Sequence, residues 1–393
     1  GYIRVHSLDN QYWIDNYLAT QLGWYSFYPQ QTFEQSDGLQ VKTMFFEDVD
    51  YLGAKSIGYN SGLSLGGISS VSLCIPVLAR NAAIFKNYEM LRKSDYFSDE
   101  IKELLKDFDR DFILVSDGEE FFLRPATYLK KKFLADGDIL TGENIYDAQT
   151  PFIRIENYFT DDESKPETVV WDFDESLPIT EQELKIDFSP TINLSSTRAL
   201  KVKVWGDGSG SSICIRFGEK DSTLSGIIDY VITVDFVGER EFTLLETDNG
   251  EYPNIEFYDK LNDIPLFYDT FKTYRNQTDL GLIKYMYIYT SGDCSGIKIG
   301  DIRAVKHTAK TLVNPTVVIG DQSITFYCEI PSNSYLEYID GVATIYDVLG
   351  YATPVESVVG SVTVPNGDFT AELIVGENNR ARLTIGLYGD RIS

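Results

Sequence analysis

The stretch YMYIYTSGDCSGIKIGDIRAVKHTAKTLVNP, residues 285–315, closes one β-module and opens another. Every second residue from Tyr285 to Tyr289 is a tyrosine with an apolar residue between, the period-2 pattern of a strand whose two faces differ. A turn signal rich in Gly and Ser follows, and three isoleucines within Ile297–Ile302 predict a second strand with a register break near Gly300-Asp301. Asn314-Pro315 then stops this sheet and starts a new run.

Short strand patterns separated by turn signals recur from Pro151 to about residue 308, and eight of them predict a jelly-roll sandwich. Residues 315–390 predict a smaller sandwich with Ig-like strand spacing, although it lacks the Cys, Trp and Cys core of antibody domains. The eight expected strands are Phe152–Phe159, Val169–Phe173, Ile192–Trp205, Ser212–Phe217, Asp229–Phe236, Glu241–Leu245, Tyr285–Tyr289 and Ile297–Ala304.

Residues 1–150 instead mix strand and helix patterns. Ser98 caps a helix whose apolar residues fall at i, i+3, i+4 and i+7, and a second helix begins near Glu47-Asp48. Alternating strands and helices argue for α/β packing with parallel strands. Only three or four strand–helix units are present, whereas a closed barrel needs eight. We therefore expect a multidomain chain: a partial TIM-barrel-like domain over 1–150, a jelly roll over 151–312 and an Ig-like β-sandwich over 313–393.

A strand pair that ends in "GDIRA" and passes straight into an Ig-like tail resembles the end of a jelly-roll carbohydrate-binding module. Such modules occur in large secreted polysaccharide-degrading enzymes of glycan-foraging bacteria. The resemblance covers residues 150–393 and implies the C-terminal part of a multimodular glycoside hydrolase. It also implies a structural Ca²⁺ where the first and last jelly-roll strands meet, with Glu156 and Asp301 as ligands; the alternative is that both are solvated surface acids. We expect no organic cofactor.

Composition restricts the partners. The chain has 393 residues, enough for two to three domains, and a formal net charge of −26, which repels nucleic acid and anionic membranes. No apolar run approaches a membrane span or a signal peptide. The chain begins directly in strand-like sequence, so we expect a processed or truncated product of a secreted, periplasmic or cell-surface protein. The four cysteines are far apart and form no metal-binding spacing, and a Cys214–Cys294 bridge is one possibility.

Trp205 is the sharpest candidate for a binding residue. Leu200, Val202 and Val204 share one face of their strand, which leaves Trp205 on the other face with two lysines. An indole on a sheet surface suits stacking on a pyranose ring, and the alternative is that a loop or neighbouring domain covers it. The alternating tyrosines of Tyr285–Tyr289 raise the same question, with an inter-domain seam or core rim as their alternative.

Catalytic candidates lie in the first 150 residues. Glycoside hydrolysis needs two carboxylates across one cleft, and in a barrel these follow the strands. Glu34 and Asp37 follow an aromatic strand in which Trp24, Tyr25 and Tyr28 could line a sugar subsite. A second acid pair, at residues 47 and 48, is explained more simply as the N-terminal cap of a helix.

The sequence thus predicts a carbohydrate-active protein that binds a polysaccharide or oligosaccharide. A half barrel cannot supply both walls of a glycosidase cleft, so we expect this chain alone to be inactive, with its open sheet edge covered by an N-terminal half or another copy. Two alternatives remain: a non-catalytic glycan-binding or adhesion protein, and a purely structural role for both β-modules.

Overall fold

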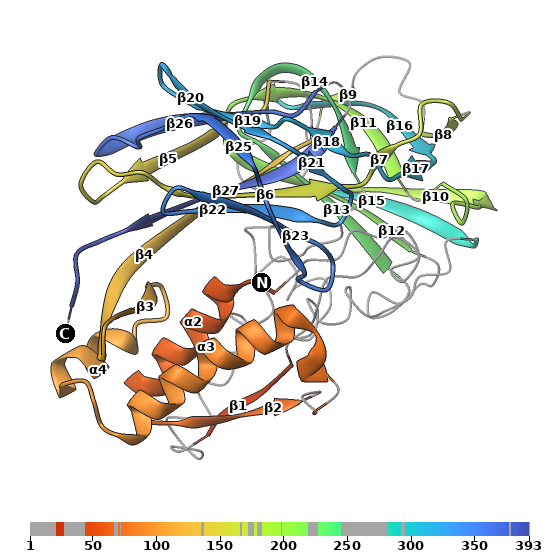
Figure 1. The fold of residues 1–393 in the computed structure, drawn as a ribbon. Coiled ribbons are helices and arrows are strands. Elements are labelled where there is room, and N and C mark those ends of the chain that lie inside the picture. Colours follow the sequence, from red (N-terminus) through yellow and green to blue (C-terminus); the bar gives the residue numbers. More distant parts are fainter. Residues whose placement is uncertain are drawn as a thin grey trace.

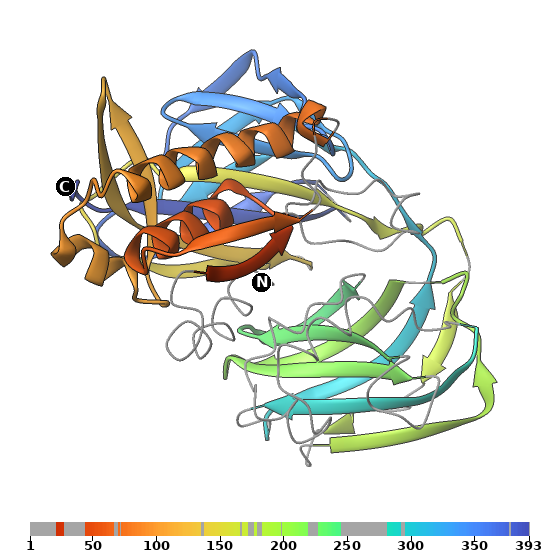
Figure 2. The ribbon, with the colours of Figure 1, turned by 90° about the horizontal axis from the view of Figure 1, so that it is seen from below.

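The computed structural model describes residues 21–26, 44–66, 70, 72–134, 137–165, 167–171, 177–178, 183–197, 199–218, 227–244, 281–291, 295–376 and 379–392. Within them the chain forms a layer of helices, a large β-sandwich and a smaller jelly roll. Figure 1 shows the helices below the large sandwich, and Figure 2 shows the jelly roll as a separate lobe.

The helical layer contains α2 (Phe46–Gly58), α3 (Pro76–Lys93) and α4 (Asp99–Leu105), with the short 3₁₀ turn Ser72–Cys74 before α3. Two parallel strands, β1 (Gln21–Ser26) and β2 (Gly62–Gly66), flank α2 in a single β-α-β unit. The start of α2 and the Ser98 cap of α4 confirm two local predictions, and the Ile101 amide donates to the Ser98 hydroxyl over 3.4 Å.

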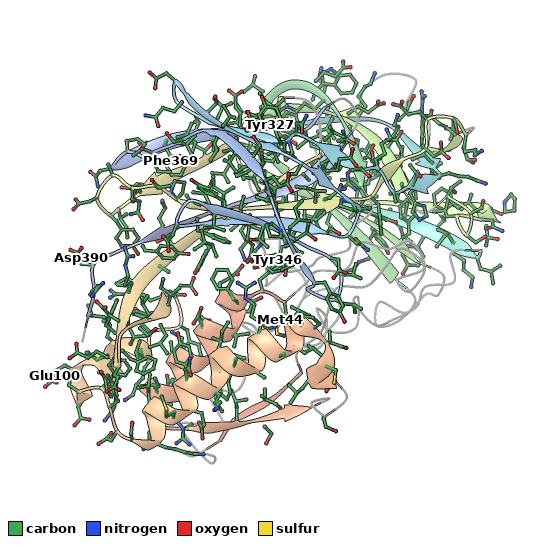
Figure 3. The ribbon with its side chains drawn as sticks, in the orientation of Figure 1. Met44, Glu100, Tyr327, Tyr346, Phe369 and Asp390 are labelled. Atoms are coloured by element: carbon green, nitrogen blue, oxygen red, sulfur yellow. The ribbon has the colours of Figure 1, made fainter. Side chains whose placement is uncertain are left out.

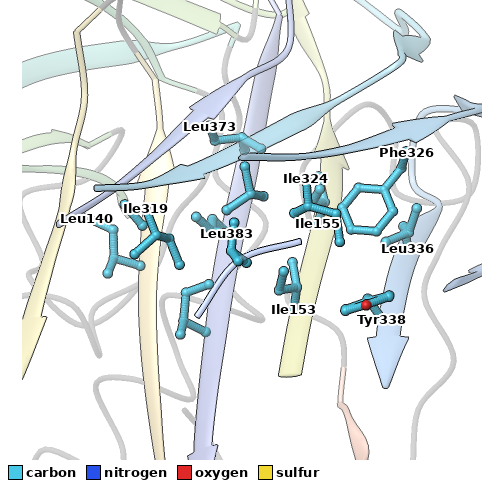
Figure 4. Close-up of a cluster of buried hydrophobic side chains, with 14 of the residues drawn as sticks. Leu140, Ile153, Ile155, Ile319, Ile324, Phe326, Leu336, Tyr338, Leu373 and Leu383 are labelled. Atoms are coloured by element: carbon cyan, nitrogen blue, oxygen red, sulfur yellow. The ribbon is translucent and has the colours of Figure 1, made fainter. Parts of the chain in front are cut away.

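The large sandwich has a seven-stranded sheet and a five-stranded sheet. The seven-stranded sheet has the order β24-β23-β22-β6-β27-β4-β3, and the five-stranded sheet has the order β25-β20-β19-β26-β5. Alternate residues of their strands, among them Ile153, Ile155, Ile324 and Leu383, fill the space between the sheets (Figure 4). The bounds are β3 Asp111–Asp117, β4 Glu120–Phe133, β5 Leu140–Asn144, β6 Phe152–Tyr158, β19 Thr316–Ile319, β20 Gln322–Tyr327, β22 Tyr335–Ile339, β23 Val342–Tyr346, β24 Ala352–Pro354, β25 Ser357–Gly360, β26 Gly367–Ile374 and β27 Arg380–Tyr388; a short ribbon of β18 (Leu312–Val313) with β21 (Glu329–Ile330) completes it.

The jelly roll is inserted into the large sandwich. Its eight main strands occupy residues 168–305, and the chain enters and leaves through the paired strands β7 (Thr160–Asp161) and β17 (His307–Thr308). One sheet has the order β10-β15-β12-β13 and the other β14-β11-β16-β8, with β9 (Leu177–Pro178) added beside β16. The bounds are β8 Thr168–Trp171, β10 Glu183–Ile192, β11 Ala199–Asp207, β12 Ser211–Gly218, β13 Ile227–Val234, β14 Val237–Leu244, β15 Ile283–Ser291 and β16 Lys298–Val305.

This strand order confirms the predicted jelly roll. If the eight main strands are counted from one to eight along the chain, one sheet has the order 2-7-4-5 and the other the order 6-3-8-1. This is the arrangement of two interleaved Greek keys. The predicted register break near Gly300-Asp301 is also present, because the pairing of β16 with β11 shifts between Ile299 and Ile302.

The partial barrel expected for residues 1–150 is wrong. The described part of that range has three α-helices and one parallel strand pair, and its β3 to β5 join antiparallel sheets of the large sandwich. Strand pairing also divides the chain differently from the expected boundaries at 150 and 312. Residues 111–158 pair with residues 316–388 to make one sandwich, so no separate Ig-like domain forms over 313–393.

Candidate functional site

The strand that carries Trp205 has the two faces expected from its sequence. Leu200, Val202 and Val204 are buried in the jelly-roll core. Trp205 lies on the opposite face of β11 with the two lysines and is half-buried. We call this surface, formed by β14, β11, β16 and β8, the Trp205 face.

The position of the indole follows from its neighbours across the sheet. Trp205 lies in register with Glu239 on β14 and Lys298 on β16, both of which are exposed. A Cβ atom at Gly300 of β16 would come within 3.0 Å of the indole Cζ3 atom. The absence of a side chain at Gly300 therefore lets the ring lie close to the sheet surface. Lys203 places its Nζ 6.0 Å from the centre of the ring.

Charged pairs lie along the Trp205 face. Lys203 and Glu239 form an ion pair of 3.2 Å, and Arg303 lies 3.0 Å from each of two carboxylates, Asp301 and Glu167. Hydrogen bonds to these two acids raise the pKa of Arg303. The surface thus offers a half-buried ring beside both hydrogen-bond donors and acceptors.

The tyrosines of β15 lie on the other sheet of the jelly roll, and the two whose side chains are described, Tyr285 and Tyr287, pack against each other. Tyr285 is buried, and its ring packs edge-on against Tyr287 with centroids 5.2 Å apart. Lys185 of β10 places its Nζ 5.6 Å from each of the two ring centres. Tyr289 lies in β15, but its side chain is outside the described residues.

A second cluster of polar residues lies between the helices and the seven-stranded sheet. We call it the ion layer; its members are Glu47, Arg80, Lys130, Arg154, Glu156, Glu337 and Arg382. The sheet contributes two rows in register, one through Glu337, Arg154, Thr384 and Lys130, and one through Tyr335, Glu156, Arg382 and Lys132. In each row one acid therefore lies beside an arginine on the neighbouring strand, Glu337 beside Arg154 and Glu156 beside Arg382.

Glu47 and Arg80 connect this layer to the helices. Glu47, at the start of α2, accepts from Arg154 through both of its oxygens and lies 2.9 Å from the Lys130 amine. Arg80 of α3 lies 2.9 Å from Glu337, and its guanidinium lies between the rings of Phe46 and Tyr346, 5.3 Å from each centre. Tyr346 in Figure 3 lies on this helix-facing side of the sandwich.

The ion pairs of the ion layer hold the helices to the seven-stranded sheet, and its acids lack the features of a catalytic pair. Burial would raise the pKa of Glu47, but Arg154 and Lys130 outweigh it and hold that pKa well below its usual range. Glu156 accepts two hydrogen bonds of 2.6 Å from Arg382. Glu47 therefore stays ionised, whereas a glycosidase needs one carboxyl group that is protonated and reaches solvent.

Asp50 is the exception among these buried acids. It lies one turn after Glu47 on α2, is 6% exposed, and accepts a 2.8 Å hydrogen bond from the Tyr88 hydroxyl. Burial raises its pKa to about 7, and the hydrogen bonds from Tyr88 and from the Leu114 backbone only partly oppose this rise. A perturbed carboxyl group often marks an active site, but Asp50 is enclosed by helices and sheet.

The structure separates the two predicted calcium ligands. Glu156 lies on β6 in the ion layer, and Asp301 lies on β16 of the jelly roll, where it pairs with Arg303. The two carboxylates thus belong to different sandwiches, and each has an arginine partner. Within the described ranges, no group of three or more His, Cys, Asp or Glu side chains could hold a metal ion.

The other predicted site residues are described only in part. Trp24 and Tyr25 lie in β1, as expected of a strand, but their side chains are outside the described residues. Tyr28, Glu34 and Asp37 are outside as well, so their proposed roles stay predictions. Asp48 accepts a 3.5 Å hydrogen bond from the Phe45 amide at the start of α2, which confirms its capping role, whereas the neighbouring Glu47 turns to the ion layer.

Sequence reasoning missed the ion layer, although a signal for it exists. In the segments Phe152–Tyr158 and Arg380–Tyr388, arginines and a glutamate occupy every second position between apolar residues. Such a pattern normally indicates a solvent-facing side. Here the helices cover that side, and Arg154 is completely buried.

Comparisons with known proteins were made for the sequence and for the fold. No protein-family model and no curated protein matches the chain. Structures that were found include the complex of the two major capsid proteins of bacteriophage P23-77, at 12% identity over 68% of this chain and 99% of that chain, with a TM-score of 0.17. Another is an atomic structure of Sulfolobus Turreted Icosahedral Virus, at 10% identity over 72% of this chain and 89% of that chain, with a TM-score of 0.15.

Such TM-scores carry no argument about the function of this chain. With no barrel in the described part of the chain, the resemblance to the C-terminal part of a glycoside hydrolase is wrong. No helix within the described residues is long and apolar enough to cross a membrane.

Proposed function

We propose that this chain is a non-catalytic saccharide-binding protein and that the Trp205 face is its binding surface. The observation that carries the proposal is the half-exposed indole at Trp205, which lies close to the sheet at Gly300 with Glu239 and Lys298 on either side. The C–H face of a pyranose stacks on the ring, while its hydroxyl groups donate to Glu239 and accept from Lys298.

The charge balance favours a neutral saccharide over an anionic one. The protein carries a formal charge of −26, and on the Trp205 face Lys203 is already paired with Glu239. A negatively charged glycan would meet the field of the whole protein with few unpaired cations to offset it. We therefore expect binding to neutral polysaccharides such as β-glucan, xylan or galactomannan rather than to pectin or sulfated glycans.

Affinity electrophoresis in gels that contain each of these polysaccharides tests the proposal. Trp205→Ala should abolish the retardation seen with the unchanged protein and leave the melting temperature nearly unchanged. Trp171→Ala is the matched control, because Trp171 is also half-buried in the same sheet but packs against the jelly-roll core. It should lower the melting temperature and retain binding at temperatures where the protein is folded.

Unaltered binding by Trp205→Ala would contradict the proposal, as would the absence of retardation by any neutral polysaccharide. The second outcome would favour a purely structural role. That role has its own support in the way the jelly roll is held to the large sandwich. Arg240 of β14 lies 2.5 Å from the buried Asp138, and Lys131 of β4 lies 2.5 Å from Asp235.

A further inference from the structure

The edge strand β25 differs from the other three edges of the large sandwich. The edges β3 and β5 contain acids, and β24 ends in Pro354. These are devices that prevent a sheet edge from pairing with another chain. The sequence of β25 is Ser-Val-Val-Gly, which has neither a charge nor a proline.

One side of β25 is open for pairing within the described structure. Its residues pair with β20, with Val359 opposite Thr325 and Ser357 opposite Tyr327. The Phe326 amide donates to Pro315 on the other side of β20, so the backbone groups of Thr325 and Tyr327 point towards β25. It follows that Val359 and Ser357 are bonded to β20, whereas the N–H and C=O groups of Val358 point away from the sheet. Gly360 has a φ of 86°, so the extended backbone ends there.

The outer surface beside this edge is also uncharged. A row of side chains in register crosses four strands of the five-stranded sheet, from Val359 through Thr325 and Thr316 to Ile374. Val359 and Ile374 are each 55% exposed. Tyr327, labelled in Figure 3 on this sheet, is 51% exposed. A chain with a charge of −26 thus presents an uncharged row of side chains next to an edge strand that has neither a charge nor a proline.

We propose that β25 pairs with β25 of a second copy of this chain, in antiparallel orientation about a two-fold axis, to join two five-stranded sheets into one. A two-fold axis at Val358 uses these outward-pointing groups, because the Val358 N–H of each copy then donates to the Val358 C=O of the other. Glu356, which precedes the strand, then faces Gly360 of the other copy and not an acid. This register brings two acidic chains together without opposing carboxylates at the seam, and it places Val359 opposite Ser357 of the other copy.

The register makes a specific prediction about Val359. Its side chain lies on the outer surface diagonally opposite Val359 of the other copy, at a distance of about 7–8 Å. V359E and V359K should each remove the dimer, because each puts two like charges near the axis. An equimolar mixture of V359E and V359K should restore it, because the charges then attract.

Sedimentation velocity of the whole chain over micromolar concentrations measures this association, and circular dichroism checks that each variant is folded. A four-residue strand predicts a weak, concentration-dependent dimer. The matched control is I374E, which places the same charge at a site equally exposed at the other end of the row. I374E should dimerise like the unchanged chain. A monomer at every concentration would overturn the proposal, and so would a dimer lost equally in V359E and I374E, which would indicate contact through the sheet surface instead.

Discussion

The Asp50 carboxyl group gives the sharpest test of how the helices are held to the sheet. Asp50 has no arginine or lysine within hydrogen-bond distance among the described side chains, unlike Glu47, Glu156 and Glu337. Its pKa rises from 3.8 to about 7 on folding because burial disfavours the charge. The folded state therefore binds a proton that the unfolded chain releases, and stability falls as the pH rises towards 7.

The expected size follows from the same values. Between pH 5 and the folded pKa of about 7, each pH unit costs about 1.4 kcal/mol, so Asp50 lowers the free energy of unfolding by ~3 kcal/mol at most by pH 8. Glu47 does not contribute in this window. Its pKa lies well below 4.5, so its stabilisation is present throughout and is lost only in more acidic solution.

Asp50→Asn isolates this effect, because the amide oxygen still accepts from Tyr88 but carries no charge. Urea unfolding followed by far-UV circular dichroism at pH 5, 6, 7 and 8 should show a gain of the variant over the unchanged protein that grows with pH. Tyr88→Phe removes the hydrogen bond that lowers the Asp50 pKa, so it should move the end of the decline to higher pH. Parallel stability curves for Asp50→Asn and the unchanged protein between pH 5 and 8 would refute the reasoning.

Three further substitutions test the packing and the ion layer. Arg154→Met should lower the free energy of unfolding by about 3–5 kcal/mol, measured in urea, because it leaves the buried Glu47 with Lys130 alone. Gly53→Ala should lower it by about 1–3 kcal/mol, because the added Cβ would lie 2.3 Å from the Tyr88 ring between α2 and α3. Arg240→Ala should increase protease cleavage between the jelly roll and the sandwich, because Asp138 loses its 2.5 Å partner, and unchanged cleavage would contradict that role.

Local patterns in the sequence predicted local structure well. The alternation along β11, the jelly roll and the Ser98 cap all follow from periodicity or capping rules that involve near neighbours. The candidate binding residue Trp205 was found in the same way, since the side of a strand can be read from its alternate residues. By contrast, the ten-residue strand β10 was missed although its apolar and polar residues alternate, because Pro190 lies inside it and a proline normally argues against a strand.

The pairing between distant strands could not be predicted from one sequence. Glu156 and Arg382 are 226 positions apart and still form a buried ion pair, because the entire jelly roll is inserted between their strands. The alternation of β6 is the same whether that strand begins a jelly roll or crosses the centre of another sandwich. Only its partners, β22 and β27, decide which of the two it does.

The insertion explains why the role expected of Glu156 changed so completely. The strands β7 and β17 pair with each other, so the chain enters and leaves the jelly roll at the same place. The strands before and after the insertion can therefore pair in one sandwich. Glu156 therefore lies on β6, before the insertion, and Arg382 lies on β27, after it, and these two strands are neighbours in the same sheet. A carboxylate in that position is covered by helices and requires a cation, and the guanidinium of Arg382 supplies it through two 2.6 Å hydrogen bonds. The same acid at the start of a jelly roll would have faced solvent, where a metal ion could reach it.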